Sequence, residues 1–438
     1  MSILALSQAE IFNAAASMLM EEVAVAGTAG DLLMQLGYLG ETAGDKAHHV
    51  RLLHAAAGFS RMFTLKAEDA PGLVTFGAEI DPHALGAEDA PLVSVSGCGL
   101  TLRRAFEACV GEGVEHLSQY AMPSDLIEQL PPEQALDDAS PALRALWDRL
   151  SPYNRLVPDR AMTGWTVAAT LATGQPVRLP ADLCFRRRAK DRDVDPPWPL
   201  SIGCAAGPDY LSATLHGLLE LVERDAVALW WRGGERPRVL AADIASAILS
   251  RLRKESERRT WLLDITSDTG VPVIVAASCN DDGYGLCCGF AARTTRAAAA
   301  SAAVLEMAQM ELAYRLTAMK RATYGEAALN EIDKLHVRRF TTINVGETLR
   351  LQPQAPPLPA CDLNTPNAQA ALNEVRRRLD LIGLAPSVLN LTRDSFGIPV
   401  TRVVCPGLEI GMSSPPGPRL SAVSERLGIP LHDAALLQ

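Results

Sequence analysis

Residues 205–231, AAGPDYLSATLHGLLELVERDAVALWW, are the stretch that most limits how this chain can fold. Apolar residues recur there at helical spacing after a Gly-Pro-Asp turn at 207–209, which predicts a well-packed amphipathic helix. Glu220, Glu223 and Arg224 stand on it beside apolar neighbours. Residues three apart share a helix face, so both carboxylates can reach one divalent cation, and the arginine suits a phosphate. The alternative is a solvated i,i+4 ion pair.

The composition is that of an ordinary globular protein, with 48% hydrophobic and 21% charged residues among 438. The net charge of -10 argues against general nucleic-acid binding, and the basic run at 186–192 is interpreted as a solvated loop. No apolar stretch approaches the roughly 18 residues of a membrane-spanning helix, and the first residues lack a secretory pattern. We therefore expect a cytoplasmic protein that binds neither nucleic acid nor membrane.

The cysteines are scattered without a C-x-x-C pair, which favours small core residues over structural zinc. They are Cys98, Cys109, Cys184, Cys204, Cys279, Cys287, Cys288, Cys361 and Cys405. The sequence contains neither a G-x-x-x-x-G-K-[ST] phosphate loop nor a G-x-S-x-G elbow. Ordinary nucleotide-binding folds and serine hydrolases are therefore not indicated.

The order of patterns predicts a mixed α/β fold with mixed rather than purely parallel sheets. Residues 1–57 read as a helical N-terminal extension, and residues 122–160 read as a proline-containing connecting insert. Three repeats of strand, glycine turn and helix are expected, and Ser96 to Gly99 are the first of these turns. The helices are expected at about 101–120, after the turn within 205–231, and at about 295–316.

Each of the three predicted helices carries acidic or amide groups at a spacing of three residues. The pairs are Glu112 and Glu115, Glu220 and Glu223, and Glu306 and Gln309. Carboxylates from several helices can bind the Mg²⁺ of a nucleotide, whereas caps and surface ion pairs are the alternative for each pair taken singly. The repetition favours a nucleotide-metal site.

Several motifs in this order resemble the YcaO family. They are the turn at 201–207 (SIGCAAG), the helix segment 218–226 (LLELVERDA), Glu112-x-x-Glu115, Leu305-Glu306-x-x-Gln309, and the late segment 398–409 (IPVTRVVCPGLE). The similarity spans residues 58–410, the predicted catalytic domain, and leaves 411–438 as a C-terminal tail.

The resemblance implies an ATP- and Mg²⁺-dependent enzyme with a YcaO-like fold, which activates a backbone amide of a ribosomally made precursor peptide. Its usual outcome is cyclodehydration of Cys, Ser or Thr to a thiazoline or oxazoline after phosphorylation of the amide oxygen. It implies Mg²⁺ ligands at Glu112, Glu115, Glu220 and Glu223. Nucleotide contacts are implied at Arg61, Arg224, Glu306 and Gln309.

The sequence departs from the family pattern at Ala108, His116 and Ile202. It also lacks the proline-rich tail of many azoline-forming members. These differences leave the exact reaction open. A thioamide- or amidine-forming enzyme is the first alternative. A non-catalytic scaffold subunit of a peptide-modifying complex is the second. The resemblance also implies a separate leader-binding partner protein, a flavin-dependent dehydrogenase as a further partner, and a homodimer within the complex.

Overall fold

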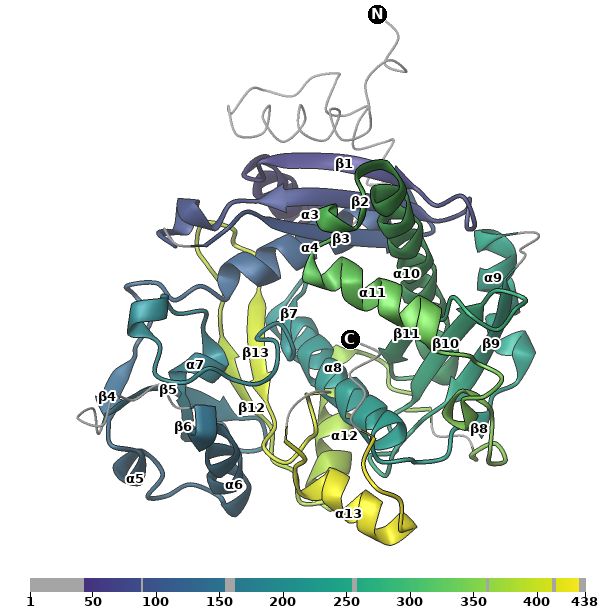
Figure 1. Ribbon diagram of the computed structural model, residues 1–438. Coiled ribbons are helices and arrows are strands. Elements are labelled where there is room, and N and C mark those ends of the chain that lie inside the picture. Colours follow the sequence, from purple (N-terminus) through teal and green to yellow (C-terminus); the bar gives the residue numbers. More distant parts are fainter. Residues whose placement is uncertain are drawn as a thin grey trace, which may run out of the picture. The chain divides into compact units, whose positions relative to one another are not determined.

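The computed structural model describes residues 43–87, 90–153, 162–253, 258–359, 362–411 and 415–432 (Figure 1). The chain forms two compact units and enters each of them more than once. Unit 1 contains residues up to 65, 74–218 and 385–404, and unit 2 contains 66–73, 219–384 and the residues from 405 onward. Of the predicted extension 1–57, residues 1–42 lie outside the described part, and α3 (Ala43–Ala57) is helical as expected.

Unit 1 contains a small antiparallel sheet in the order β1-β2-β3 (Arg61–Lys66, Val74–Ile80, Val93–Gly99). Strands β2 and β3 pair from Val74 opposite Gly99 to Ile80 opposite Val93. Helix α4 (Leu102–Ser118) packs on β3 and β2. Its N-cap residue is Thr101, whose hydroxyl accepts the Arg104 N–H.

A second sheet of unit 1 has the order β4-β5-β12-β13-β7, and β6 pairs with β5. The bounds are β4 Glu128–Leu130, β5 Thr163–Thr170, β6 Pro176–Pro180, β7 Cys204–Ala206, β12 Ser387–Asn390 and β13 Val400–Val404. The predicted insert supplies β4 together with the helices α5 (Pro132–Ala135) and α6 (Pro141–Leu150). Helix α7 (Ala181–Cys184) follows β6.

Unit 2 is built on an antiparallel sheet in the order β11-β10-β9-β8 (Cys287–Ala292, Val273–Cys279, Arg259–Asp264, Arg238–Val239). The long helix α10 (Arg296–Tyr324) lies along β11 and β10, and it extends two turns beyond the predicted end (Figure 1). The other helices are α9 Ser246–Leu252, α11 Glu331–Thr342, α12 Ala368–Leu381 and α13 Pro418–Leu427. Helix α8 (Tyr210–Trp231) is the predicted amphipathic helix, and its residues from Leu219 onward belong to unit 2.

Two glycines allow helices to approach strands closely. A Cβ on Gly97 would overlap the backbone of Ala105 and Ala108 in α4, and a Cβ on Gly289 would overlap the backbone of Ala303 and Met307 in α10. The expectation that Ser96 to Gly99 form a turn is wrong, because these residues complete β3. Their glycines serve helix-strand contact, which sequence spacing does not distinguish from a turn.

The prediction of a solvated basic loop at 186–192 is confirmed for Arg188 and Lys190, which are exposed, and is wrong for Arg187. The Arg187 guanidinium is 7% exposed and donates to Asp182 and, at 2.8 Å, to Asp193. A buried guanidinium is tolerated when carboxylates pair with it, and here two do so. The run therefore contains a structural ion-pair cluster that its composition conceals.

The cysteine prediction is confirmed where it can be examined. The eight described cysteines are not in disulfides, and all but Cys98 are buried, whereas Cys361 lies outside the described residues. Burial raises the pKa of Cys109 to about 12, which keeps that thiol protonated near neutral pH. Among the described helices, none has the length and apolarity needed to cross a membrane.

Candidate active site

In unit 1, the two predicted carboxylates of α4 are held by backbone amides of two strands. The Ser96 N–H in β3 donates to Glu112 Oε2 at 2.9 Å. The Ala206 N–H in β7 donates to Glu115 Oε1 at 2.8 Å. Main-chain amides of β3 and β7 thus orient both carboxylates of α4.

In unit 2, Glu223 and Glu306 are held in the same way by β11. The Phe290 N–H donates to Glu306 Oε2 at 3.1 Å, and the Ala292 N–H donates to Glu223 Oε2 at 3.3 Å. Alternate residues of one strand thereby orient one carboxylate from α10 and one from α8.

The four hydrogen bonds follow one rule along the chain. Glu112 and Glu306 each accept from the strand that precedes their own helix, in both cases from a residue 16 positions earlier. Glu115 on α4 and Glu223 on α8 each accept from a strand later in the chain, the strand that precedes the next of the three acidic helices. The predicted repetition of strand and helix is therefore confirmed at the level of hydrogen bonding, and each unit contains both kinds of bond.

Desolvation by the surrounding protein disfavours the charged form of three of these carboxylates, although Glu223 is buried, Glu306 is half-buried and Glu112 is exposed. Desolvation raises the pKa of Glu112 to about 7, although the Ser96 N–H opposes the shift. Burial also raises the pKa of Glu223 and of Glu306, with the charge of Arg224 opposing the shift in both cases. A cation in contact with such groups restores their ionised form, so the donor set and its environment fit Mg²⁺.

Arg224 lies among the carboxylates of unit 2. Its Nη2 is 3.6 Å from Glu220 Oε1 and 3.6 Å from Glu223 Oε1, so both ion pairs are loose. Burial lowers the pKa of Arg224, but Glu223, Glu220 and Glu306 together raise it above its ordinary value. Among the described residues, nothing accepts a hydrogen bond from its buried Nε. The guanidinium is charged and retains donor capacity, as a phosphate contact requires.

The two remaining predicted residues are Gln309 and Arg61. Gln309 is half-buried on α10, one turn after Glu306. Arg61 is exposed at the start of β1, and its guanidinium carbon is 4.9 Å from the centroid of the Phe63 ring. In unit 2 the structure brings Glu220, Glu223, Arg224 and Glu306 together, whereas Arg61 belongs to unit 1.

Two arginines near these groups have no predicted role. Arg293 comes directly after Ala292, the last residue of β11. Its charge opposes the rise in pKa that desolvation causes in Glu223 and Glu306. Arg402 on β13 is 2% exposed and donates to the carbonyls of Ile202, at 2.6 Å, and Leu200. Arg402 lies within the segment 398–409 that resembles the family, so its sequence position could have indicated a role. Nothing in the local sequence indicates a role for Arg293.

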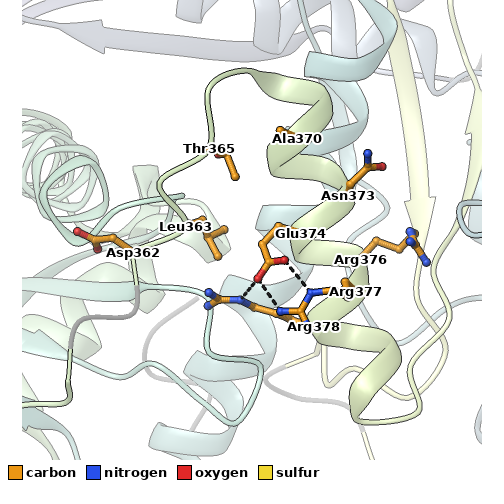
Figure 2. A pocket seen from close by; sticks show the side chains of 9 residues that line it. All are labelled: Asp362, Leu363, Thr365, Ala370, Asn373, Glu374, Arg376, Arg377 and Arg378. Carbon is orange, nitrogen blue, oxygen red and sulfur yellow. Dashed lines mark hydrogen bonds and ion pairs between the residues drawn. The ribbon is translucent and has the colours of Figure 1, made fainter.

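Two surface hollows occur in unit 2 away from these residues. One of about 660 Å³ lies beside α12, where Figure 2 shows Glu374 between Arg377 and Arg378. The other, of about 970 Å³, is bordered by residues such as Asp69, Asp282 and Met319. Neither is lined by a predicted site residue.

Within the described residues, no three His, Cys, Asp or Glu side chains gather into a group able to hold a metal ion by themselves. Mg²⁺ commonly takes one or two protein carboxylates and completes its octahedron with phosphate oxygens and water. The pairs on α4 and α8 match that requirement in number and charge.

The family model described as YcaO cyclodehydratase, ATP- and Mg²⁺-binding, matches residues 96–409. The chain belongs to the YcaO family. Two relatives are similar to the chain over most of its length. An uncharacterized protein of Methanothermobacter thermautotrophicus is 27% identical over 382 residues, 81% of this chain and 90% of that protein. An uncharacterized protein in the tfuA 3' region of Rhizobium leguminosarum bv. trifolii is 26% identical and covers 81% of this chain and 85% of its own length.

Solved structures confirm the YcaO fold. A heterocyclase in complex with substrate and cofactor is 21% identical with a TM-score of 0.66, and the match covers 92% of this chain but only 57% of that one. YcaO from Methanopyrus kandleri, bound with AMPPCP and Mg²⁺, is 20% identical with a TM-score of 0.58 and covers 84% and 91%. The E. coli microcin synthetase McbBCD complex is 14% identical with a TM-score of 0.53 and covers 81% and 89%. The family description also confirms the prediction of ATP and Mg²⁺ as cofactors.

Proposed function

We propose that this YcaO protein uses Mg²⁺ and ATP to activate a backbone amide of a ribosomally synthesised precursor peptide and cyclises Cys, Ser or Thr to an azoline. The observation that carries the proposal is that strand amides fix the carboxylates in each unit: Glu112 and Glu115 in unit 1, and Glu223 and Glu306 in unit 2, where Arg224 lies beside Glu223. Glu112, Glu115, Glu220 and Glu223 are proposed as Mg²⁺ ligands. Arg61, Arg224, Glu306 and Gln309 are proposed as nucleotide contacts.

The proposed chemistry requires stabilisation of phosphate charge above all. The substrate thiol or hydroxyl adds to the preceding carbonyl carbon, the resulting oxyanion takes the γ-phosphoryl group with release of ADP, and the amide nitrogen loses a proton as phosphate leaves. The addition of the thiol or hydroxyl, which loses its proton, closes the five-membered ring; the carbonyl oxygen then departs on phosphate as the C=N bond forms. When bound, Mg²⁺ would neutralise phosphate charge, and Arg224 would supply a fork of donors to the phosphate.

A precursor peptide and partner proteins follow from this proposal. The McbBCD complex is a structural neighbour of this chain, and one relative is encoded beside tfuA. We propose a leader-binding partner encoded near this protein's own gene, with a flavin-dependent dehydrogenase as a further component and a homodimer as the state within the complex.

A second reaction that the same nucleotide site would serve is thioamide or amidine formation, in which a different nucleophile adds to the amide carbonyl.

The test begins with binding of Mg²⁺-ATP to the purified full chain by calorimetry. We expect binding by the native chain and its loss in Glu223→Gln. Glu235→Gln is the matched control, because Glu235 pairs with Arg426 instead. If the native chain does not bind the nucleotide, the proposed enzymatic function is wrong, and the alternative of a non-catalytic scaffold subunit is favoured.

The reaction itself is tested by incubating the chain with Mg²⁺-ATP, its genomically neighbouring proteins and a neighbouring precursor peptide. Mass spectrometry distinguishes the products, since loss of water marks an azoline and exchange of oxygen for sulfur marks a thioamide. An unmodified peptide in the presence of nucleotide binding and all partners would contradict both reactions.

A further inference from the structure

Residues 405–411 and 415–432 form a segment that we call the C-terminal strap, and it packs on the part of α8 that belongs to unit 2. Leu420 and Val423 of α13 pack with Leu229 of α8 in one apolar cluster. The Arg232 guanidinium donates to the Gly411 carbonyl at 3.2 Å. The strap is thus attached along the half of α8 that follows Glu223 and Arg224.

Asp225, the residue after Arg224, is the polar centre of this attachment. Its side chain is fully buried and accepts three hydrogen bonds within unit 2. The Glu409 N–H donates to Oδ1 at 3.0 Å, and Arg419 donates from Nε to Oδ1 at 2.9 Å and from Nη2 to Oδ2 at 2.8 Å. The fork of Arg419 also contacts Asp268, whose side chain is 57% exposed.

Glu409 completes the strap by capping α13. The N-cap residue of this helix is Gly417, which has no side chain to accept a hydrogen bond. Buried Glu409 takes that role, accepting the N–H groups of Gly417 at 3.1 Å and Leu420 at 3.3 Å. A carboxylate at a helix N-terminus is stabilising, and here it fixes where Arg419 stands relative to Asp225.

We propose that Asp225 and Arg419 are positioning residues for nucleotide binding: the Arg419 fork, set in place by Glu409 and α13, holds α8 in the rotation that presents Glu223 and Arg224 to Mg²⁺-ATP. This inference rests on the proposed function. Asp225 follows Arg224 on α8, and successive residues of a helix are related by a fixed rotation about its axis. A rotation of α8 that moves Asp225 therefore moves Glu223 and Arg224 as well. Outer groups that orient ligands typically change metal affinity or activity by about tenfold to a hundredfold when removed.

The alternative is that the contacts of Asp225 and Arg419 stabilise the fold and have no effect on nucleotide binding. Replacing Arg419 by Met leaves Asp225 buried beside one backbone N–H, which lowers stability whether or not α8 turns. The two roles differ in nucleotide affinity measured on folded protein. The pair Arg419→Lys and Arg419→Met separates them further, because Lys keeps a charge for Asp225 but lacks the fork that engages both oxygens.

The experiment measures Mg²⁺-ATP affinity of the full chain by calorimetry, below the unfolding temperature of each variant. We expect Arg419→Met and Asp225→Asn to weaken binding about tenfold or more and Arg419→Lys to fall between them and the native chain. Asp268→Asn and Arg426→Ala, which change exposed groups near and on α13, are expected to stay within about twofold. The reconstituted reaction is expected to show a raised KM for ATP with a smaller change in kcat.

Hydrogen exchange of the α13 amides reports detachment of the strap independently. Native affinity in Arg419→Met or Arg419→Lys, with faster exchange in α13, would overturn the inference while leaving the proposed function intact. If Arg419→Met does not fold, Arg419→Lys alone decides. Absence of binding by the native chain would overturn the proposed function, a result distinct from equal binding by native and variant chains.

Discussion

Replacing Glu112 by Gln is expected to stabilise the metal-free protein near neutral pH. Glu112 lies in unit 1 and accepts the Ser96 N–H, and desolvation by the surrounding protein raises the pKa of its carboxyl from the ordinary value of 4.5 to about 7, although its side chain is exposed. Because solvent screens an exposed carboxylate, we expect this shift to act against the folded state by only about 1 kcal/mol once the group is ionised in both states. Gln keeps a carbonyl for the Ser96 N–H and carries no charge.

The dependence on pH follows from the sign of the shift. Because the folded-state pKa is raised, the native chain loses stability relative to the variant as the pH rises from about 4.5 to about 7. The advantage of Glu112→Gln is therefore absent below about pH 4.5 and complete above pH 7. Added Mg²⁺-ATP is expected to reverse it, because only the native carboxylate can bind the cation.

Urea unfolding without metal at pH 5 and pH 8 measures this difference. Glu107→Gln on the same helix is the matched control, since Glu107 pairs with Arg103 at 2.9 Å and with Arg104 at 3.1 Å. Its replacement is expected to lower stability. Equal stability of native and Glu112→Gln proteins at pH 8, or a gain that does not change with pH, would refute the reasoning.

Three further predictions concern other parts of the fold. Arg187→Met leaves two buried aspartates unpaired and is expected to lower the free energy of unfolding by about 3 to 5 kcal/mol, measured by urea titration. Gly289→Ala forces α10 away from β11, so we expect lost Mg²⁺-ATP binding in calorimetry and a lowered Tm in calorimetric scans. Arg377 and Arg378 lower the pKa of Glu374 to about 2, so its stabilisation is present above about pH 4.5 and is lost as the pH falls towards 2. Since this group is largely exposed, Glu374→Gln is expected to cost less than about 1 kcal/mol in urea titrations at pH 7.

Helical spacing was sufficient to predict α4 and α8 closely, because each buries an apolar face at period 3.6. The same reasoning failed at Ser96 to Gly99, where glycines permit a helix to lie on a strand. Their sequence signature is also that of a turn, and only the packed partner distinguishes the two.

The paired carboxylates could be predicted from their spacing, but their fixation could not. Glu115 depends on Ala206 and Glu223 depends on Ala292, residues 91 and 69 positions away. Backbone amides carry no side-chain identity, so no motif records such a contact. Likewise, Asp225 and Glu409 stand in recognisable motifs, yet the partnership with Arg419 depends on how α13 packs on α8.

The most direct test of the central claim follows the amide oxygen. A precursor peptide labelled with ¹⁸O at the reacting carbonyl is incubated with this YcaO protein, its partners, Mg²⁺ and ATP, and the released phosphate is analysed by mass spectrometry. Activation of the backbone amide by phosphorylation places the label in phosphate, whether an azoline or a thioamide forms. Product formation with unlabelled phosphate would contradict the proposed chemistry.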